Sequence, residues 1–287
     1  ELETESVQMC VTSPPYWGLR DYGHDDQLGL ERTPEEYTAN MVEVFSHVKR
    51  VLKDDGTLWL NLGDSYSGSG KGPSQSLNKE YHNLEKTHSK IVPIGLKPKD
   101  LVGIPWRVAF ALQADGWYLR QDIIWHKPNP MPESVTDRCT KSHEYIFLMS
   151  KSDKYFYDAD AIKVKTTSPP HIMGNVMAPD KGMGGLNNIG DPSRVIGEDG
   201  FRNKRSVWTV NTKPYKGSHF AVFPQELIEP CIQAGSRTGD VVLDPFFGSG
   251  TTGEVAERFG RDYIGIELNN DYKLLQHKRC AQMGFKI

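Results

Sequence analysis

A glycine-rich turn between a short apolar strand and a helix, near the C-terminal end of the chain, constrains the fold most strongly. The turn, DPFFGSGTT, starts at Asp244, directly after the apolar run Val241–Leu243. A helix predicted over 251–259 and a strand predicted over 263–266 follow it, and Glu267 comes directly after that strand. In open α/β sheets this order places the glycines and the acid at the carboxyl edge of the sheet, where nucleotide ligands bind. The turn lacks a full G-x-G-x-x-G pattern, which disfavours a dinucleotide.

The rest of the chain alternates predicted strands and helices in the same way. A capping box starts the first helix, with Thr33 as the cap, Pro34 at the first helical position and Glu36 three residues after the cap. The predicted strands cover 7–11, 57–62, 117–125 and 143–149, and the predicted helices cover 33–52, 101–114, 224–234 and 270–283. Two polar segments, 65–99 and 163–205, show little apolar periodicity. We therefore predict a doubly wound α/β sheet with two inserts, the first of them a mobile surface loop.

Charge is distributed unevenly along the chain, although the formal total is only −3. Residues 1–66 carry a net charge of −8, whereas residues 163–216 carry +5. No apolar run reaches the roughly 20 residues of a membrane span, and the N-terminus lacks the basic and apolar regions of a secretory signal. The four cysteines and nine histidines show no zinc-binding spacing, so we expect no metal site. Scattered thiols fit a reducing, cytoplasmic location.

A second loop with chemical character ends the first predicted strand. The run Ser13–Tyr16, SPPY, is followed by Trp17, and its two prolines stop any strand and hold the loop rigid. Such a loop points carbonyl groups and a hydroxyl to one side, next to two aromatic rings. Acceptors of this kind can take the N–H groups of an exocyclic amine while an aromatic ring stacks on the base. The loop is therefore a suitable cradle for a planar ring with an exocyclic amine.

Together the two loops resemble those of a known family. TSPPYW and DPFFGSGTT, in this order, are similar to the motifs of β-class amino-methylating DNA methyltransferases, which act on cytosine N4 or adenine N6. The run WHKPN from Trp125 and the segment from His219-Phe220 to Phe223-Pro224 also resemble that family. The resemblance covers nearly the whole chain except 67–95 and 163–205. It implies a Rossmann-like methyltransferase sheet, S-adenosylmethionine as cofactor and double-stranded DNA as substrate.

The resemblance also implies roles for particular residues. The SPPY loop would hold the amine of a flipped base, with Ser13, Pro14, Pro15 and Tyr16 as the catalytic set. The methionine end, the ribose and the far side of the cofactor pocket would be contacted by Asp244, Phe246, Gly248, Ser249, Gly250, Thr251, Glu267, His219, Phe220 and Phe223. A cytosine C5 mechanism would need a nucleophilic Pro-Cys loop, whereas the one Pro-Cys pair here, at Cys231, falls within a predicted helix.

The order of the motifs implies a division of the chain. Residues 1–162 would form the catalytic half of the methyltransferase domain, including the mobile loop 65–99, and 217–287 its cofactor-binding half. The basic segment 163–216 lies where the family keeps its target-recognition segment. The expected DNA contacts are Lys127, Arg194, Arg202, Lys204 and Arg205. A cognate restriction endonuclease acting on the same site would be the protein partner, and both monomer and dimer fit the sequence.

Several alternatives stay open at the level of sequence. Ser13 before Pro-Pro favours cytosine N4, and adenine N6 is the second target. A methyltransferase acting on RNA or a protein amide, and a non-catalytic DNA-binding relative, are further interpretations of the same motifs. Family members usually carry a further strand and a Gly-Asp turn before the catalytic strand. Because only twelve residues precede Ser13, we expect native residues before Glu1.

Overall fold

The structure, a computed structural model, describes residues 2–24, 26–68, 92–166, 171–172, 195–196, 200–213 and 223–280. The chain divides into two compact units. The larger unit comprises Glu1–Tyr157 and Ser206–Ile287, and the smaller comprises Asp158–Arg205. Of the predicted loop 65–99, residues 69–91 lie outside the described part, and its two ends are joined by a hydrogen bond of 2.8 Å from Lys99 N to Ser67 O.

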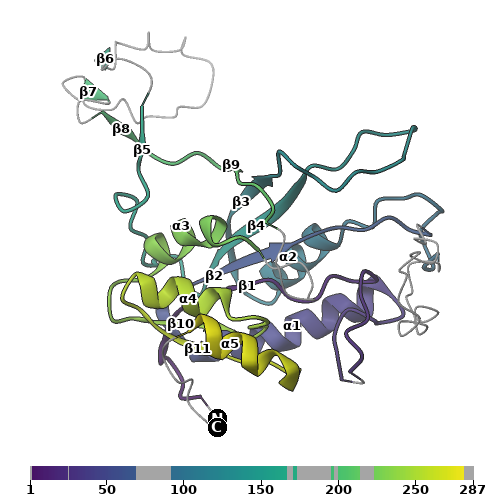
Figure 1. The fold of residues 1–287 in the computed structure, drawn as a ribbon, viewed down its shortest axis with the longest axis horizontal. Helices are drawn as coiled ribbons and strands as arrows, with labels where there is room; N and C mark the ends of the chain where they lie inside the picture. The colour runs from purple at the N-terminus through teal and green to yellow at the C-terminus, as the bar shows by residue number, and fades with distance from the viewer. Residues whose placement is uncertain are drawn as a thin grey trace, which may run out of the picture. The chain divides into compact units, whose positions relative to one another are not determined.

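A seven-stranded mixed sheet forms the centre of the larger unit, in the order β11-β10-β1-β2-β4-β3-β9 (Figure 1). β1 pairs in parallel with β10 and β2, β10 with β11, and β3 with β9, whereas β4 is antiparallel to both β2 and β3. The strands are β1 (Val7–Thr12), β2 (Leu52–Leu62), β3 (Tyr118–His126), β4 (His143–Ser150), β9 (Val207–Thr209), β10 (Val241–Asp244) and β11 (Asp262–Gly265).

Helices cover both faces of this sheet. On one face Leu58 and Leu60 pack in the core cluster with buried residues of α1 (Pro34–Val51) and α2 (Ile104–Ala114). On the other face Trp59 lies against Gly235, the last residue of α3 (Gln225–Gly235), where a Cβ would approach the indole nitrogen to 2.8 Å. Alternate side chains of β2 thus pack against the helices on opposite faces of the sheet. The remaining helices are α4 (Thr251–Arg258), the 3-10 turn η3 (Asn270–Tyr272) and α5 (Lys273–Arg279).

Local signals in the sequence explain where most helices begin and end. Thr33 accepts a hydrogen bond from Glu36 N at 3.1 Å, and α1 starts at Pro34 as predicted. The helix predicted over 101–114 begins only at Ile104, because Gly103 before it takes a left-handed φ of 78°. The last predicted helix, 270–283, is a 3-10 turn followed by α5, and the described chain ends at Cys280. No helix in the described ranges is long and apolar enough to cross a membrane.

The described part of the smaller unit contains two short antiparallel strand pairs. β5 (Val164–Lys165) pairs with β8 (Phe201–Arg202), and β6 (His171–Ile172) pairs with β7 (Val195–Ile196). The predicted recognition segment 163–216 extends past this unit. Its residues 207–209 form β9, which belongs to the central sheet, because Ile124, Trp125 and His126 of β3 pair with β9 in register.

Candidate functional site

The two loops singled out in the sequence start side by side at one edge of the sheet. Cys10 of β1 pairs with Leu243 of β10, so the two parallel strands end together. Beyond the pairing, Thr12 Oγ1 donates a hydrogen bond of 2.6 Å to Asp244 Oδ1. The end of the strand that leads into SPPY is therefore tied to the first residue of the glycine-rich turn. This is the edge at which α/β sheets bind ligands.

Asp244 organises the glycine-rich turn from inside. Its side chain is buried, and Oδ1 also accepts a bond of 3.0 Å from Phe246 N, while Oδ2 accepts one of 2.6 Å from Thr252 Oγ1. Burial raises the pKa of this carboxyl to about 6, against the opposing effect of the three hydrogen bonds. The side chain predicted to contact the ligand thus also holds β1, the turn and α4 together.

The turn itself is shaped by close packing around Phe247. The ring stacks on Tyr263 with centroids 5.5 Å apart, and it lies so close to Gly265 that a Cβ there would be 2.3 Å from Cγ. Gly248 and Gly250 take positive φ values of 51° and 87°. Glycine adopts such conformations without a steric cost. The backbone of the turn is therefore held in one conformation, with no side chain at the two glycine positions.

Glu267 and Ser249 give this turn its polar groups. Glu267 Oε2 accepts a bond of 2.7 Å from Gly248 N, and Oε1 accepts one of 2.8 Å from Asn269 N. Each carboxylate oxygen can accept a further bond, so the acid retains capacity for hydroxyl groups. Ser249 Oγ is buried and has no hydrogen-bond partner among the described residues. A buried hydroxyl without a partner costs free energy unless a ligand or water satisfies it. These residues therefore fit a nucleoside cofactor.

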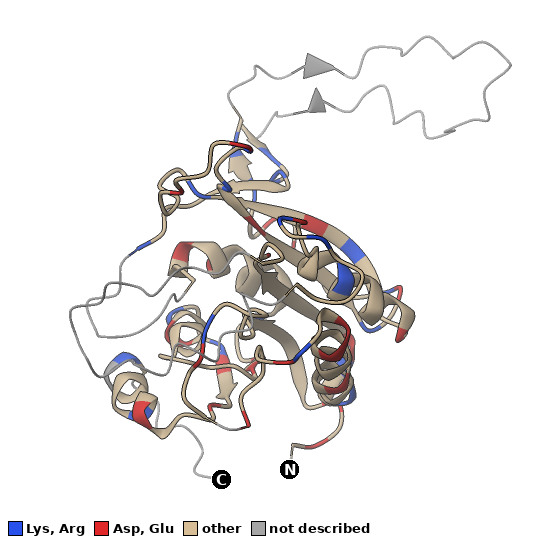
Figure 2. Cartoon of the chain, turned by 90° about the vertical axis from the view of Figure 1, so that its right-hand side faces the viewer, with Lys and Arg blue, Asp and Glu red and all other residues tan. Residues whose placement is uncertain are grey.

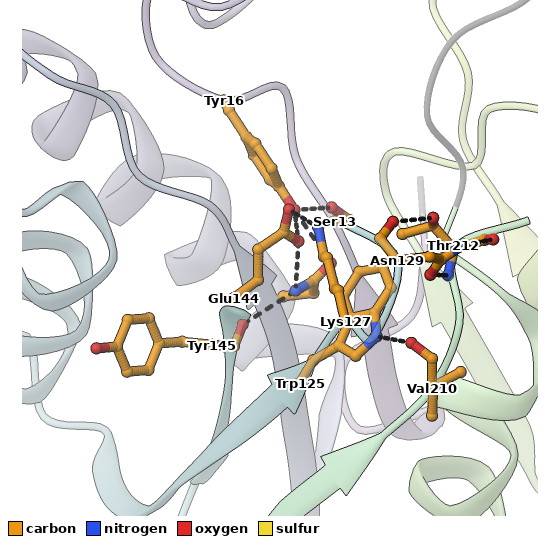
Figure 3. A network of polar contacts seen from close by, with 10 residues as sticks. Ser13, Tyr16, Trp125, Lys127, Asn129, Glu144, Tyr145, Val210 and Thr212 are labelled. Carbon is orange, nitrogen blue, oxygen red and sulfur yellow. Dashed lines mark hydrogen bonds and ion pairs between the residues drawn. The ribbon is translucent and has the colours of Figure 1, made fainter. Parts of the chain in front are cut away.

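The SPPY loop is held by contacts on both sides. Tyr37 Oη of α1 donates a hydrogen bond of 2.8 Å to the carbonyl of Pro15. The Tyr16 hydroxyl lies 3.3 Å from Ser13 Oγ, 3.1 Å from Asn61 Oδ1 and 2.8 Å from Glu144 Oε2. The predicted catalytic residues Ser13 and Tyr16 are thus brought together at one end of a polar network (Figure 3).

That network continues into β2, β3 and β4 (Figure 3). Asn61 Nδ2 donates to the Tyr145 carbonyl at 3.0 Å, and Lys127 forms an ion pair with Glu144. The Lys127 ammonium also lies 4.2 Å from the centre of the Trp125 ring. Lys127, expected to contact DNA, is therefore engaged next to the SPPY loop, with only 17% of its side chain exposed. Sequence reasoning missed Asn61 and Glu144, for which the only signal was a polar residue within an apolar strand.

The remaining predicted residues are distributed over both units. Phe223 directly precedes Pro224, the cap of α3, and is partly buried. Arg202, Lys204 and Arg205 belong to the smaller unit, in which Lys163 pairs with Asp160 at 2.9 Å. Basic and acidic positions are interspersed in the described part of the chain (Figure 2). His219, Phe220 and Arg194 lie outside the described residues.

A glycine sets the position of the Tyr16 ring and gives a first prediction. A Cβ on Gly63 would lie 2.4 Å from Tyr16 Cε2, so Gly63→Ala must displace the ring. We expect about a hundredfold lower kcat for the reaction at this site, because misplacing a reacting group by about 1 Å costs that much. The free energy of unfolding should fall by about 1–3 kcal/mol. Initial-rate measurements and urea unfolding check both values.

Gly239 provides the control for that substitution. It has a positive φ of 82°, and a Cβ at this position would meet no atom within 4 Å, so Gly239→Ala strains only the local backbone. This variant should lose about 1 kcal/mol of stability and keep its kcat. A Gly63→Ala rate close to that of the Gly239→Ala protein would contradict the role given to the Tyr16 ring.

The fold and the two loops define an α/β methyltransferase, and comparison with known proteins identifies the family. Residues 7–278 match the family described as DNA methylase, the N6/N4 methyltransferases. The chain is 51% identical over 271 residues to the Type II methyltransferase M.Cfr9I of Citrobacter freundii, covering 94% of this chain and 80% of the relative. It is 50% identical over 281 residues to the Type II methyltransferase M.SmaI of Serratia marcescens, covering 98% and 86%. The chain belongs to the N6/N4 DNA methylase family.

Solved structures share the fold. The PvuII DNA methyltransferase, named as cytosine-N4-specific, superposes with a TM-score of 0.64 at 20% identity, covering all of this chain and 83% of the other. The complex of M1.HpyAVI with S-adenosylmethionine gives a TM-score of 0.51 at 17% identity, covering 97% and 89%. The predicted Rossmann-like fold and the family resemblance are confirmed. The enzyme is a DNA methyltransferase. Its cofactor is S-adenosylmethionine.

Proposed function

We propose that this chain is a site-specific Type II DNA methyltransferase that methylates the exocyclic amine of a flipped base, with cytosine N4 as its target. The observation that most supports this proposal is the hydrogen bond between Thr12 and Asp244, which sets the SPPY loop beside the glycine-rich turn. An amine acceptor and a nucleoside site therefore share one edge of the sheet. The names of M.Cfr9I and M.SmaI support the Type II assignment, and Ser13 before the prolines supports cytosine.

The chain would act mainly by positioning the target amine. Ser13 Oγ accepts an N–H of the amine, which localises on nitrogen the lone pair that the ring otherwise withdraws. The Tyr16 ring packs against the base after it leaves the helix. The bound cofactor would supply a methyl group on a sulfonium: the amine nitrogen forms the new N–C bond as the S–C bond breaks, a neutral thioether leaves, and the surplus amine proton is released to solvent. Holding donor and acceptor in line supplies up to roughly 7–11 kcal/mol of the barrier.

The same proposal assigns the cofactor-binding residues. Glu267 would hold the ribose hydroxyls, because each of its oxygens retains acceptor capacity. Ser249 would offer its buried hydroxyl, and Gly248 and Gly250 would let the ligand approach the backbone. Asp244 would shape the pocket from inside the turn. A covalent intermediate is not needed, and Cys231 lies buried within α3 with Sγ 3.6 Å from Leu227 O.

Recognition of DNA is assigned to the basic segment 163–216. Its net charge of +5 contrasts with −8 for residues 1–66, and most of it forms a unit of its own. Lys and Arg side chains there would neutralise phosphates and fix the register on the duplex. We include Arg194, Arg202, Lys204 and Arg205 in this role. In a restriction–modification system the cognate endonuclease would read the same sequence.

Methyl transfer from labelled S-adenosylmethionine tests the proposal. The enzyme is incubated separately with duplex DNA, RNA and a protein mixture, and the DNA product is digested to nucleosides. We expect label in DNA as N4-methylcytosine. N6-methyladenine instead would change the target base and leave the reaction type intact. Label only in RNA or protein, or no transfer with intact cofactor binding, would overturn the assignment.

A further inference from the structure

We propose that Glu144 is a positioning residue that fixes the direction of the hydrogen bonds in the SPPY loop, so that Ser13 presents acceptor lone pairs to the target amine. The inference rests on the proposed function, because it concerns the amine that Ser13 would hold. Glu144 reaches Ser13 only through Tyr16. It therefore acts on the reaction indirectly.

The number of hydrogens on Tyr16 sets the direction. A phenol has one O–H to donate, and the Tyr16 hydroxyl has two acceptors near it, Glu144 Oε2 at 2.8 Å and Asn61 Oδ1 at 3.1 Å. The carboxylate is the closer and the stronger acceptor. Once this hydrogen points to Glu144, Tyr16 can only accept from Ser13. The Ser13 hydrogen then points to Tyr16, and its lone pairs stay available.

The orientation of Asn61 supports this assignment. Its Nδ2 donates to the Tyr145 carbonyl at 3.0 Å, on β4, and lies 3.4 Å from Glu144 Oε2. Asn61 is buried, and turning its amide round would set its oxygen against the carbonyl. Its oxygen therefore faces Tyr16, where it too can only accept. Within the described network, Ser13 is the one side chain that donates a hydrogen bond to the Tyr16 hydroxyl.

Lys127 holds the Glu144 carboxylate in place. The two side chains form an ion pair with 17% and 16% of their surface exposed, and the Trp125 ring lies under the ammonium. Trp125 is itself fixed by a bond of 2.8 Å from Nε1 to the Val210 carbonyl. A pair so little exposed is screened weakly by solvent. Burial and the nearby carboxylate also raise the pKa of Tyr16 well above its ordinary value, so the phenol keeps its proton.

The direction matters for the chemistry. A serine that accepts an N–H of the amine concentrates electron density on nitrogen, which favours attack on the methyl group. A serine that donates to the same nitrogen would occupy the lone pair that must attack. The acceptor direction is therefore productive and the donor direction is inhibitory. Glu144 selects the first without touching the base.

Glu144→Gln removes the acceptor that fixes the direction, at nearly constant side-chain shape. The glutamine oxygen can still accept from Lys127, which leaves its NH₂ group facing Tyr16. Tyr16 must then accept that N–H, and its own hydrogen is divided between Asn61 Oδ1 and Ser13, so Ser13 is no longer held in the acceptor direction. We expect kcat for methyl transfer to DNA to fall about tenfold or more, the usual weight of one oriented hydrogen bond. The KM values for DNA and cofactor should change less than about twofold, since neither contact is removed.

Two further proteins separate positioning from general damage. In a Tyr16→Phe background, which keeps the ring and removes the relay, Glu144→Gln should cause no further loss of kcat. Glu229→Gln breaks the ion pair of α3 with Arg258 of α4, at 2.5 Å, and should leave kcat unchanged.

The outcomes are distinct. An unchanged kcat in Glu144→Gln, or an equal further loss in the Tyr16→Phe background, would overturn the role of Glu144. Thermal unfolding of each protein identifies a variant that has lost its fold, and the comparison within the Tyr16→Phe background then decides. Failure of the wild-type enzyme to methylate DNA would instead overturn the proposed function.

Discussion

Replacing Ser13 with alanine is expected to lower kcat for methyl transfer about 10³-fold, the upper range for removing one preorganised hydrogen-bonding group from a reacting centre. The hydroxyl oxygen is the acceptor that would localise the lone pair of the amine. Its one side-chain hydrogen bond within the described part of the chain, to Tyr16 Oη at 3.3 Å, is long, so the fold should lose little free energy. Single-turnover transfer to duplex DNA measures the rate. Titration calorimetry with the cofactor should give an unchanged affinity.

Ser6 is the matched control for this substitution. It lies just before β1, is partly exposed to solvent, and donates a hydrogen bond of 2.7 Å to the Glu3 carbonyl. Ser6→Ala removes a serine hydroxyl from the same stretch of chain without touching the loop, and its kcat should equal that of the wild type. A kcat for Ser13→Ala within about threefold of that for Ser6→Ala would contradict a role of the Ser13 hydroxyl in methyl transfer.

The main elements of the site could be predicted because their signals are local. Proline pairs, glycines and a capping threonine constrain the backbone within a few residues, so the SPPY loop, the glycine-rich turn and the start of α1 follow from short segments. Their pairing at one edge follows from parallel strands ending together, as β1 and β10 do. The structure moves the predicted strand and helix ends by only a few residues.

The network around Glu144 could not be predicted because it depends on strand order. Glu144 and Asn61 meet only because β4 is antiparallel to β2, and Lys127 joins them across the pairing of β3 with β4. Apolar periodicity identifies strands but does not order them. Lys127 was predicted to contact DNA, and the sequence did not reveal that its ammonium pairs with Glu144, 17 residues along the chain. The same limit applies to β9, which sits in an irregular stretch of sequence and is a strand through its pairing with β3.

Asp244 shows that a motif position does not reveal which atoms a side chain contacts. The glycine-rich turn predicted that Asp244, its first residue, contacts the cofactor, and that stays a prediction. The structure adds that its oxygens accept from Thr12, Phe246 and Thr252, three groups on β1, the turn and α4. Each of these distances is ordinary for a hydrogen bond. The residue therefore couples the two loops mechanically, and its removal should affect stability first.

Replacing Asp244 with alanine is expected to lower the free energy of unfolding by about 4 kcal/mol at pH 5. The substitution leaves Thr12 Oγ1, Phe246 N and Thr252 Oγ1 without their acceptor in a buried position, and each such group costs about 1–3 kcal/mol. The cost should be largest at low pH. The raised pKa of about 6 means that the folded protein binds this proton more tightly than the unfolded chain, whose ordinary value is 3.8. The stability that the carboxyl contributes is thus fully present below the unfolded value and is lost as pH rises through about 6.

Asp244→Asn separates the carboxyl's charge from its hydrogen bonds. The amide resembles the protonated acid, keeps an acceptor for Thr12 and Phe246, and can donate to Thr252 Oγ1 after that hydroxyl rotates. Between about pH 4 and pH 7 the wild type should lose roughly 3 kcal/mol of unfolding free energy that the Asp244→Asn protein keeps. This difference is the free-energy equivalent of the rise in the Asp244 pKa from 3.8 to about 6. Urea unfolding across this range measures the difference for the wild type, the alanine and the asparagine proteins. Parallel curves for wild type and Asp244→Asn would mean that the carboxyl does not titrate in this window, and an alanine cost below about 1 kcal/mol at pH 5 would deny the residue its coupling role.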